Sequence, residues 1–215
     1  MAVDSESLQF LVDAGVGYTL LTSKQIIGLP PGGGAGPYRV ELPNGKSIVV
    51  FARHDPLSAE LSFKVHNLGG AGHWAHNALG PARKGVESLL LLATAGETFG
   101  HHFAGEEQFL YWLVQHEARK VGYELTTLDQ VFLNTKPIHT VQIVERSSWG
   151  DQPGLSQWFM GSTEGGNDTT WKGALRRALD NAASDLDRVY EDLVTPFGVD
   201  PYVLRDEYLP AIFAG

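Results

Sequence analysis

A run of five apolar residues, Ile48-Val49-Val50-Phe51-Ala52, constrains the fold more than any other feature of the chain. A strand that is apolar on both faces must be covered on both sides, which is typical of a central strand in an α/β structure. The turn Pro43-Asn44-Gly45-Lys46 precedes this run, and an Asn-Gly pair favours a tight hairpin. The sequence therefore predicts two paired strands over residues 38–42 and 47–53.

Helical and extended patterns alternate along the rest of the chain. The apolar run Leu89–Ala93 predicts a second buried strand over 87–94, and Thr140–Val144 alternates as a strand. Apolar residues recur at helical spacing over 106–121 and over 171–193. Shorter elements are expected as a helix capped by Asp4 or Ser5, a strand over 18–21, and a helix that begins at Thr126 or Thr127 and runs through Phe132. This order predicts an α/β layer or barrel with a helical C-terminal addition.

Length, charge and composition bound the possible functions. The chain has 215 residues, for which one domain is the default expectation. A formal charge of −9 argues against nucleic acid and anionic membranes as partners. The absence of cysteine excludes disulfides and thiolate metal sites. We expect a cytoplasmic protein, because the N-terminal residues lack a basic segment followed by an apolar run. We also expect no cofactor and no metal site.

Polar side chains follow three of the predicted strands. In a parallel sheet, functional groups gather beyond the carboxyl ends of the strands, and carboxylates beside aromatic rings suit a sugar. The candidate residues are His54 and Asp55 after the strand 47–53, Glu97, His101 and His102 after the strand 87–94, and Glu145 and Trp149 after the strand 140–144.

Four of these candidates also have a purely structural interpretation. Glu97 can cap a helix or pair with an arginine, and Asp55 before Pro56 is a natural turn residue. Glu145 can form a surface pair with the neighbouring Arg146, and Trp149 can belong to the core. Adjacent histidines on a strand point to opposite faces, which argues against a metal site at residues 101 and 102.

The segment Leu91-Leu92-Ala93-Thr94-Ala95-Gly96-Glu97-Thr98-Phe99-Gly100-His101-His102 resembles the A-T-D-G-E-T-F/Y-G-H-H segment of glycoside hydrolase family 57. Other pieces follow in the family's order. They are 2–21, Pro37-Tyr38-Arg39-Val40 with Phe51, Glu145-Arg146-Ser147-Ser148-Trp149-Gly150, and Trp171–Glu191. The resemblance implies an incomplete (β/α)7 barrel and retaining action on α-glucans. The chain would then be a single domain, with an α/β part over 1–150 and a helical part over 151–215, that resembles the C-terminal half of the family's catalytic region.

Two departures bear on the activity that the resemblance implies. The family's nucleophilic glutamate precedes the region where this chain starts, so the front half of the barrel is expected to be missing. The acid/base aspartate aligns with Ala95, whose methyl group can neither donate a proton nor carry charge. A double displacement needs two carboxyl groups about 5 Å apart, so it would have to be rebuilt from other acids.

Two classes of function stay open. The first is a small glycoside hydrolase in which Glu97 and Asp55 form the carboxyl pair, while His54, His101, His102, Glu145 and Trp149 contact the carbohydrate substrate. The second is a saccharide-binding or interaction domain without catalysis, or an inactive fragment of a family 57 enzyme. Both imply a homo-oligomer, because half of a barrel leaves sheet edges and apolar surface exposed.

Overall fold

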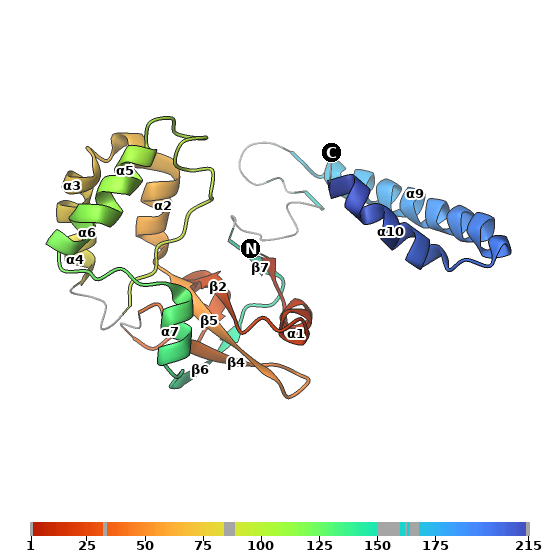
Figure 1. Cartoon of the computed structure of the whole chain (residues 1–215), viewed down its shortest axis with the longest axis horizontal. Helices are drawn as coiled ribbons and strands as arrows, with labels where there is room; N and C mark the ends of the chain where they lie inside the picture. The colour runs from red at the N-terminus through yellow and green to blue at the C-terminus, as the bar shows by residue number, and fades with distance from the viewer. Residues whose placement is uncertain are drawn as a thin grey trace. The chain divides into compact units, whose positions relative to one another are not determined.

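The computed structural model of the chain describes residues 2–31, 34–83, 89–149, 160–161, 163 and 168–213 (Figure 1). These residues fall into two compact units, 1–151 and 152–215, and each unit is considered by itself. The predicted division at residue 150 lies outside the described residues, and the single-domain organisation stays a prediction.

The first unit is built on a five-stranded sheet with the strand order β2-β5-β4-β6-β3. β5 is parallel to β2 and antiparallel to β4, and β4 is parallel to β6. β2 and β3 stand at opposite ends of this order, yet only the 3₁₀ turn η1 separates them, so the sheet curls in the manner of a barrel. The strands are β1 (Ala2–Val3), β2 (Tyr18–Thr22), β3 (Ile26–Ile27), β4 (Tyr38–Glu41), β5 (Ser47–Arg53), β6 (His139–Ile143) and β7 (Ser147–Ser148).

The hairpin and the central strand that the sequence predicts are confirmed. β4 and β5 pair from Glu41 and Ser47 back to Tyr38 and Val50, around a turn in which Gly45 adopts a φ of 78°. β5 lies between β2 and β4, and its residues 50–52 are buried on both faces. The α/β class predicted from the alternating pattern is therefore observed.

Helices form most of the other regular structure in the described part of the chain. Asp4 caps the first helix by accepting a hydrogen bond from the Ser7 amide (2.8 Å), and the predicted helix after Thr127 forms with Thr127 as its cap. The helix predicted over 106–121 is a continuous helical stretch that contains one π-helical turn. The helices and turns are α1 (Ser5–Asp13), η1 (Ser23–Gln25), α2 (Asp55–Lys64), η2 (Val65–Asn67), α3 (Ala71–Trp74), the π turn Ala75–Leu79, α4 (Gly80–Ala82), α5 (Glu107–Trp112), the π turn Leu113–Glu117, α6 (Ala118–Lys120), α7 (Leu128–Asn134), α9 (Trp171–Val194), η7 (Thr195–Phe197) and α10 (Pro201–Phe213).

The prediction of a buried strand over 87–94 is wrong for the residues that the structure describes. Residues 89–94 are half-buried and belong to no strand, and 87–88 lie outside the described residues. Both edges of β5 are already occupied by β2 and β4, so this segment forms no ladder with β5. Instead, the Leu89 carbonyl accepts from the Ala35 amide (3.0 Å) and the Leu91 carbonyl accepts from the His54 amide (2.7 Å).

Two apolar clusters support the first unit. One packs the alternate residues 48, 50 and 52 of β5, together with β4 and β6, against Leu8 of α1. The other joins α2, α3 and α5 through Leu61, Trp74 and Phe109. The junction between β5 and α2 therefore lies between the sheet core and the helical core.

Candidate functional site

Asp55 lies at the junction between β5 and α2, where its carboxylate bonds to Ser23 at the end of β2 and to Arg53 at the end of the parallel strand β5. Its Oδ1 atom accepts from Arg53 Nε at 2.8 Å, and its Oδ2 atom accepts from the Ser23 amide (3.1 Å) and hydroxyl (2.6 Å). The side chains of Arg53 and Asp55 are 15% and 20% exposed. Asp55 is thus the first residue of a helix with a fixed carboxylate, not a simple turn residue.

Arg53 joins Trp149 to this group. The guanidinium carbon of Arg53 lies 4.5 Å from the centre of the Trp149 ring, in the geometry of a cation–π contact. Trp149 is half-buried, and its buried indole Nε1 atom has no hydrogen-bond partner among the described residues. One face of the ring is therefore occupied by Arg53, so only the opposite face can stack on a sugar.

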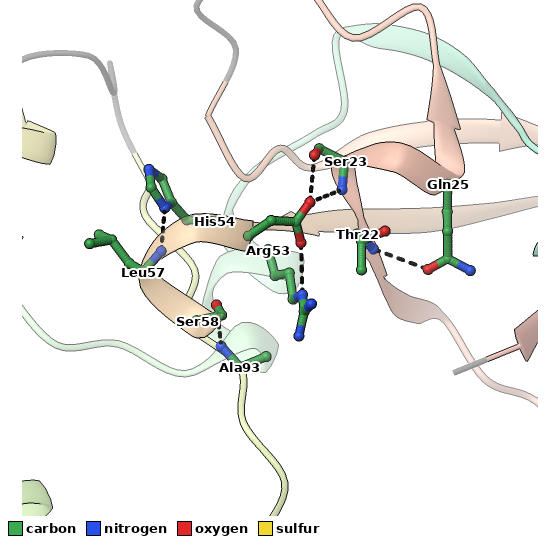
Figure 2. Close-up of polar contacts among 9 residues, drawn as sticks. Thr22, Ser23, Gln25, Arg53, His54, Leu57, Ser58 and Ala93 are labelled. Carbon is green, nitrogen blue, oxygen red and sulfur yellow. Dashed lines mark hydrogen bonds and ion pairs between the residues drawn. The ribbon is translucent and has the colours of Figure 1, made fainter. Parts of the chain in front are cut away.

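His54 caps α2 and borders a small cavity. Its Nδ1 atom accepts from the Leu57 amide at 3.3 Å, which places the proton of a neutral ring on Nε2 (Figure 2). The cavity has a volume of about 170 Å³ and is lined by His54, Asp55, Ser23 and the segment 89–91, among others. His54 and Asp55 therefore share one cavity.

Glu97 lies on a compact turn, as an exposed side chain. Within the described residues, its carboxylate has no hydrogen-bond or ion-pair partner, although its carbonyl accepts from the His102 amide at 2.9 Å. His101 and His102 are also exposed, with their ring centres 5.2 Å apart. This turn presents one carboxylate and two imidazoles to solvent.

Aromatic contacts hold the turn in place. Phe99 stacks on Phe109 with the ring centres 6.4 Å apart, and Phe103 and His66 lie edge to face. The Nδ1 atom of His66 lies 2.6 Å from a carboxylate oxygen of Glu106. Thr98, between Glu97 and Phe99, is buried to 1% exposure. The base of the turn is therefore fixed, although its polar side chains are exposed.

A larger groove of about 800 Å³ lies beside the same turn. Thr94 and Phe99 line it together with residues of α5, the following π turn and α7. Leu89, Leu90 and Leu91 line both this groove and the small cavity at Asp55. One chain segment thus borders the Asp55 cavity on one side and the groove next to Glu97 on the other.

Glu145 is committed to the start of α1. Its carboxylate accepts from the Ser5 amide at 2.9 Å and from the Ser5 hydroxyl. Acidic groups are favourable at a helix N-terminus, where amide groups lack partners. The described residues contain no ion pair between Glu145 and Arg146, so the interpretation of Glu145 as a surface pair with its neighbour is wrong.

The assumption that three strands end at one edge is also wrong for Glu145. β6 is parallel to β4 and therefore runs opposite to β5, so the two strands leave the sheet in opposite directions. The chain then reverses through β7, which brings Trp149 onto Arg53. The structure thus joins His54, Asp55 and Trp149, while Glu97, His101 and His102 form a separate group and Glu145 belongs to α1.

Ser23 and Arg53 belong to this site but are not among the residues that the sequence pattern predicts. Ser23 directly follows β2, whose last residue, Thr22, pairs with Arg53 at the end of the parallel strand β5. The sequence does contain a signal for Ser23, because it closely follows the strand predicted over 18–21 and parallel neighbouring strands end at the same edge of a sheet. The described part of the chain contains no group of three or more His, Asp or Glu side chains that could hold a metal ion. Among the described helices, none is long and apolar enough to cross a membrane.

Comparisons with known proteins bear on the fold and the family. The model of glycosyl hydrolase family 57 matches residues 1–143. A crystal structure described as that of a novel exo-type maltose-forming amylase from Pyrococcus sp. ST04 superposes with a TM-score of 0.68 at 16% sequence identity. The match covers 92% of this chain but 39% of the amylase chain, and at this identity it shows a shared fold. No curated protein matches the sequence.

Proposed function

Because the chain belongs to glycosyl hydrolase family 57, we propose that it is a glycoside hydrolase that cleaves oligosaccharides or simple glycosides. The observation that carries this proposal is that the segment 89–91 forms a wall of two cavities, one lined by Asp55 and the other by Thr94 and Phe99, which flank Glu97 in the sequence. Asp55 borders one cavity, and the turn with Glu97 borders the other. A groove of about 800 Å³ is large enough for a small oligosaccharide.

In this proposal the two carboxyl groups have different tasks, as glycoside hydrolysis requires. Glu97 is assigned as the proton donor to the departing glycosidic oxygen, because no hydrogen bond or ion pair within the described residues keeps its carboxyl group away from a bound sugar. Asp55 is the carboxylate that attacks the anomeric carbon, because Arg53 and Ser23 fix its orientation. Asp55 and Glu97 belong to separate groups in this structure, so the substrate must bind across the shared segment 89–91 to reach both. As the bond between the anomeric carbon and the Asp55 oxygen forms, the glycosidic bond breaks and the departing oxygen takes the proton of Glu97. Water then attacks the anomeric carbon, the bond to Asp55 breaks, and the proton that the water gives up returns to Glu97.

Substrate contacts are proposed for the remaining candidates. His101 and His102 offer ring nitrogens beside Glu97, and His54 offers Nε2 toward the cavity of Asp55. The free face of Trp149 would stack on a sugar ring. For Glu145 to contact the substrate, its carboxylate must release the Ser5 amide when the substrate binds. The proposal also includes a cytoplasmic location and a carbohydrate partner in place of nucleic acid, consistent with the formal charge of −9.

The test is hydrolysis of a panel of nitrophenyl α- and β-glycosides by the purified chain and three variants. Glu97→Gln and Asp55→Asn should each lose turnover. Glu41→Gln, which changes an exposed acid at the end of β4, should retain it and serves as the matched control. Full turnover by Glu97→Gln, with an unchanged unfolding midpoint, contradicts the assignment.

A second candidate function is saccharide binding without hydrolysis. Ala95 favours it, because this exposed residue occupies the position at which the resemblance places the family's acid/base aspartate. The commitment of both Asp55 oxygens to Ser23 and Arg53 favours it as well. Calorimetric binding of the same sugars, with no turnover of any glycoside in the panel, would decide for this candidate.

A further inference from the structure

The long helix α9 in the second unit carries an apolar stripe that the described residues of that unit leave exposed. The stripe follows alternating steps of four and three residues, which is the spacing of a coiled-coil seam. Its five large side chains are between 49% and 69% exposed. The stripe consists of Leu175, Leu179, Ala182, Leu186, Val189 and Leu193.

The neighbouring helix α10 contacts a different face of α9. The Tyr190 hydroxyl donates to the Pro201 carbonyl at 2.9 Å, and Tyr202 donates to the Glu191 carboxylate. At about 100° per residue, Tyr190 and Glu191 lie outside the narrow arc of the stripe. Both residues are half-buried, whereas the stripe is exposed. Figure 1 shows α10 alongside α9, and with α10 in this position the stripe stays exposed among the described residues of the second unit.

Charge along α9 is arranged against the helix dipole. Residues 171–182 contain three bases and one acid, whereas residues 183–194 contain four acids and one base. The dipole favours the opposite distribution, with acids near the N-terminus and bases near the C-terminus. The first turn of α9 has no acid, and the last turn has no base. This arrangement costs stability in a lone helix, but an antiparallel neighbour of the same sequence would compensate it.

Side-chain size along the stripe also favours an antiparallel neighbour. If two copies cross at residue 184, Ala182 of one lies opposite Leu186 of the other, and Leu179 lies opposite Val189. A small residue then faces a large one, which fills the space between the helices. In a parallel pair, Ala182 would face Ala182 and leave a gap.

We propose that α9 is a homodimerisation surface, on which a second copy of this chain docks its own α9 antiparallel. The two apolar stripes meet along the seam, and the basic end of each helix lies beside the acidic end of the other. This surface involves only the second unit and does not depend on the catalytic proposal.

The first experiment is sedimentation analysis of the full chain. The wild-type chain should sediment at twice its mass of 23.4 kDa. Leu186→Asp should raise the dimer dissociation constant about 100-fold, because a carboxylate would be buried in the seam. Leu133→Asp is the matched control, since Leu133 is exposed on α7 in the first unit, and it should remain dimeric. A monomeric wild-type chain, or a dimer that survives Leu186→Asp, overturns the proposal.

Orientation is tested by crosslinking, for which the chain is suited because it contains no cysteine. Leu175→Cys and Leu193→Cys variants should crosslink with a short bis-maleimide only when they are mixed. Within a pair of identical variants, the antiparallel arrangement separates the thiols by about 27 Å along the axis. Crosslinking of either variant alone would show a parallel pair and refute the arrangement.

Variants that reverse charges on α9 give an independent test, because they leave the side chains of the apolar stripe unchanged. The double change Arg176→Glu and Arg177→Glu makes α9 acidic along its length, and it should abolish the dimer. A chain with Asp185→Arg and Asp192→Arg, which changes two exposed acids in the C-terminal half of α9, should likewise be monomeric alone, and the two variants should form a mixed dimer. Failure of this mixture to associate while both variants remain folded contradicts the proposal.

Discussion

Replacing Asp55 by alanine tests whether its carboxylate holds β2, β5 and α2 together. The change removes an ion pair with Arg53 and two hydrogen bonds from Ser23. It also leaves the Arg53 guanidinium, whose side chain is 15% exposed, against the Trp149 ring without its carboxylate partner. The effect on stability should therefore exceed that of losing an ordinary surface pair.

The expected loss lies between two limits. Breaking a fully buried pair costs about 3–5 kcal/mol, whereas an exposed pair contributes about 0.2–1 kcal/mol. Arg53 and Asp55 are mostly but not completely shielded, so we expect Asp55→Ala to lower the free energy of unfolding by about 3 kcal/mol. Asn keeps the size and one acceptor oxygen, so Asp55→Asn should lose about half as much.

Urea unfolding followed by tryptophan fluorescence measures this loss. With an m-value of about 2 kcal/mol per M, Asp55→Ala should lower the midpoint by about 1.5 M. Asp13→Ala is the matched control, because Asp13 pairs with Lys46 where both side chains are more than half exposed, and it should cost less than about 1 kcal/mol. If Asp55→Ala lowers the free energy of unfolding no more than Asp13→Ala does, the conclusion that Asp55 holds β2, β5 and α2 together is wrong.

Two further predictions concern α1 and the sheet. Asp4→Ala should cost about 1 kcal/mol at pH 7, because Asp4 caps α1. Hydrogen bonds from Ser7 hold the pKa of Asp4 below its ordinary value of 3.8. The stability that the wild type has over Asp4→Ala should therefore be complete above pH 3.8 and shrink as the pH falls further. A difference in urea midpoint between the two chains that does not change with pH contradicts this prediction. Phe51→Ala should cost about 3–5 kcal/mol in urea unfolding, because Phe51 is fully buried at the centre of β5 against Tyr18. Phe63→Ala, at a position 77% exposed, should stay within about 0.5 kcal/mol, and equal losses at both positions would refute the packing argument.

Much of the local structure could be predicted because its causes are local. Asn44 and Gly45 favour a hairpin turn whatever surrounds them, and Asp4 and Thr127 cap helices within a few residues of themselves. The central position of β5 follows from its two apolar faces. The apolar segment 89–94 shows the limit of that reasoning, because it becomes a strand only if a neighbouring strand has a free edge, and β5 has none.

The candidate site was predictable only in part, for a related reason. His54 and Asp55 lie at a strand end, as predicted, because the position of a strand end is a local property. Their partners are not local. Ser23 reaches Asp55 across 32 residues, and Ser5 reaches Glu145 across 140 residues. Which carboxylate is held by which donor depends on strand directions, and the antiparallel relation of β5 and β6 cannot be read from either strand alone.

The strand order has a consequence for synthesis on the ribosome. β2, β4 and β5 all lie within the first 53 residues, whereas β6, the other neighbour of β4, begins at His139. At about 5–20 residues per second, the intervening segment takes roughly 4–17 s to make. During that time the outer edge of β4 has no partner, and unpaired edges are sites of mispairing between chains. Arg39 and Glu41, the charged and exposed residues of β4, lie on this edge and would oppose such pairing while the nascent chain waits for β6.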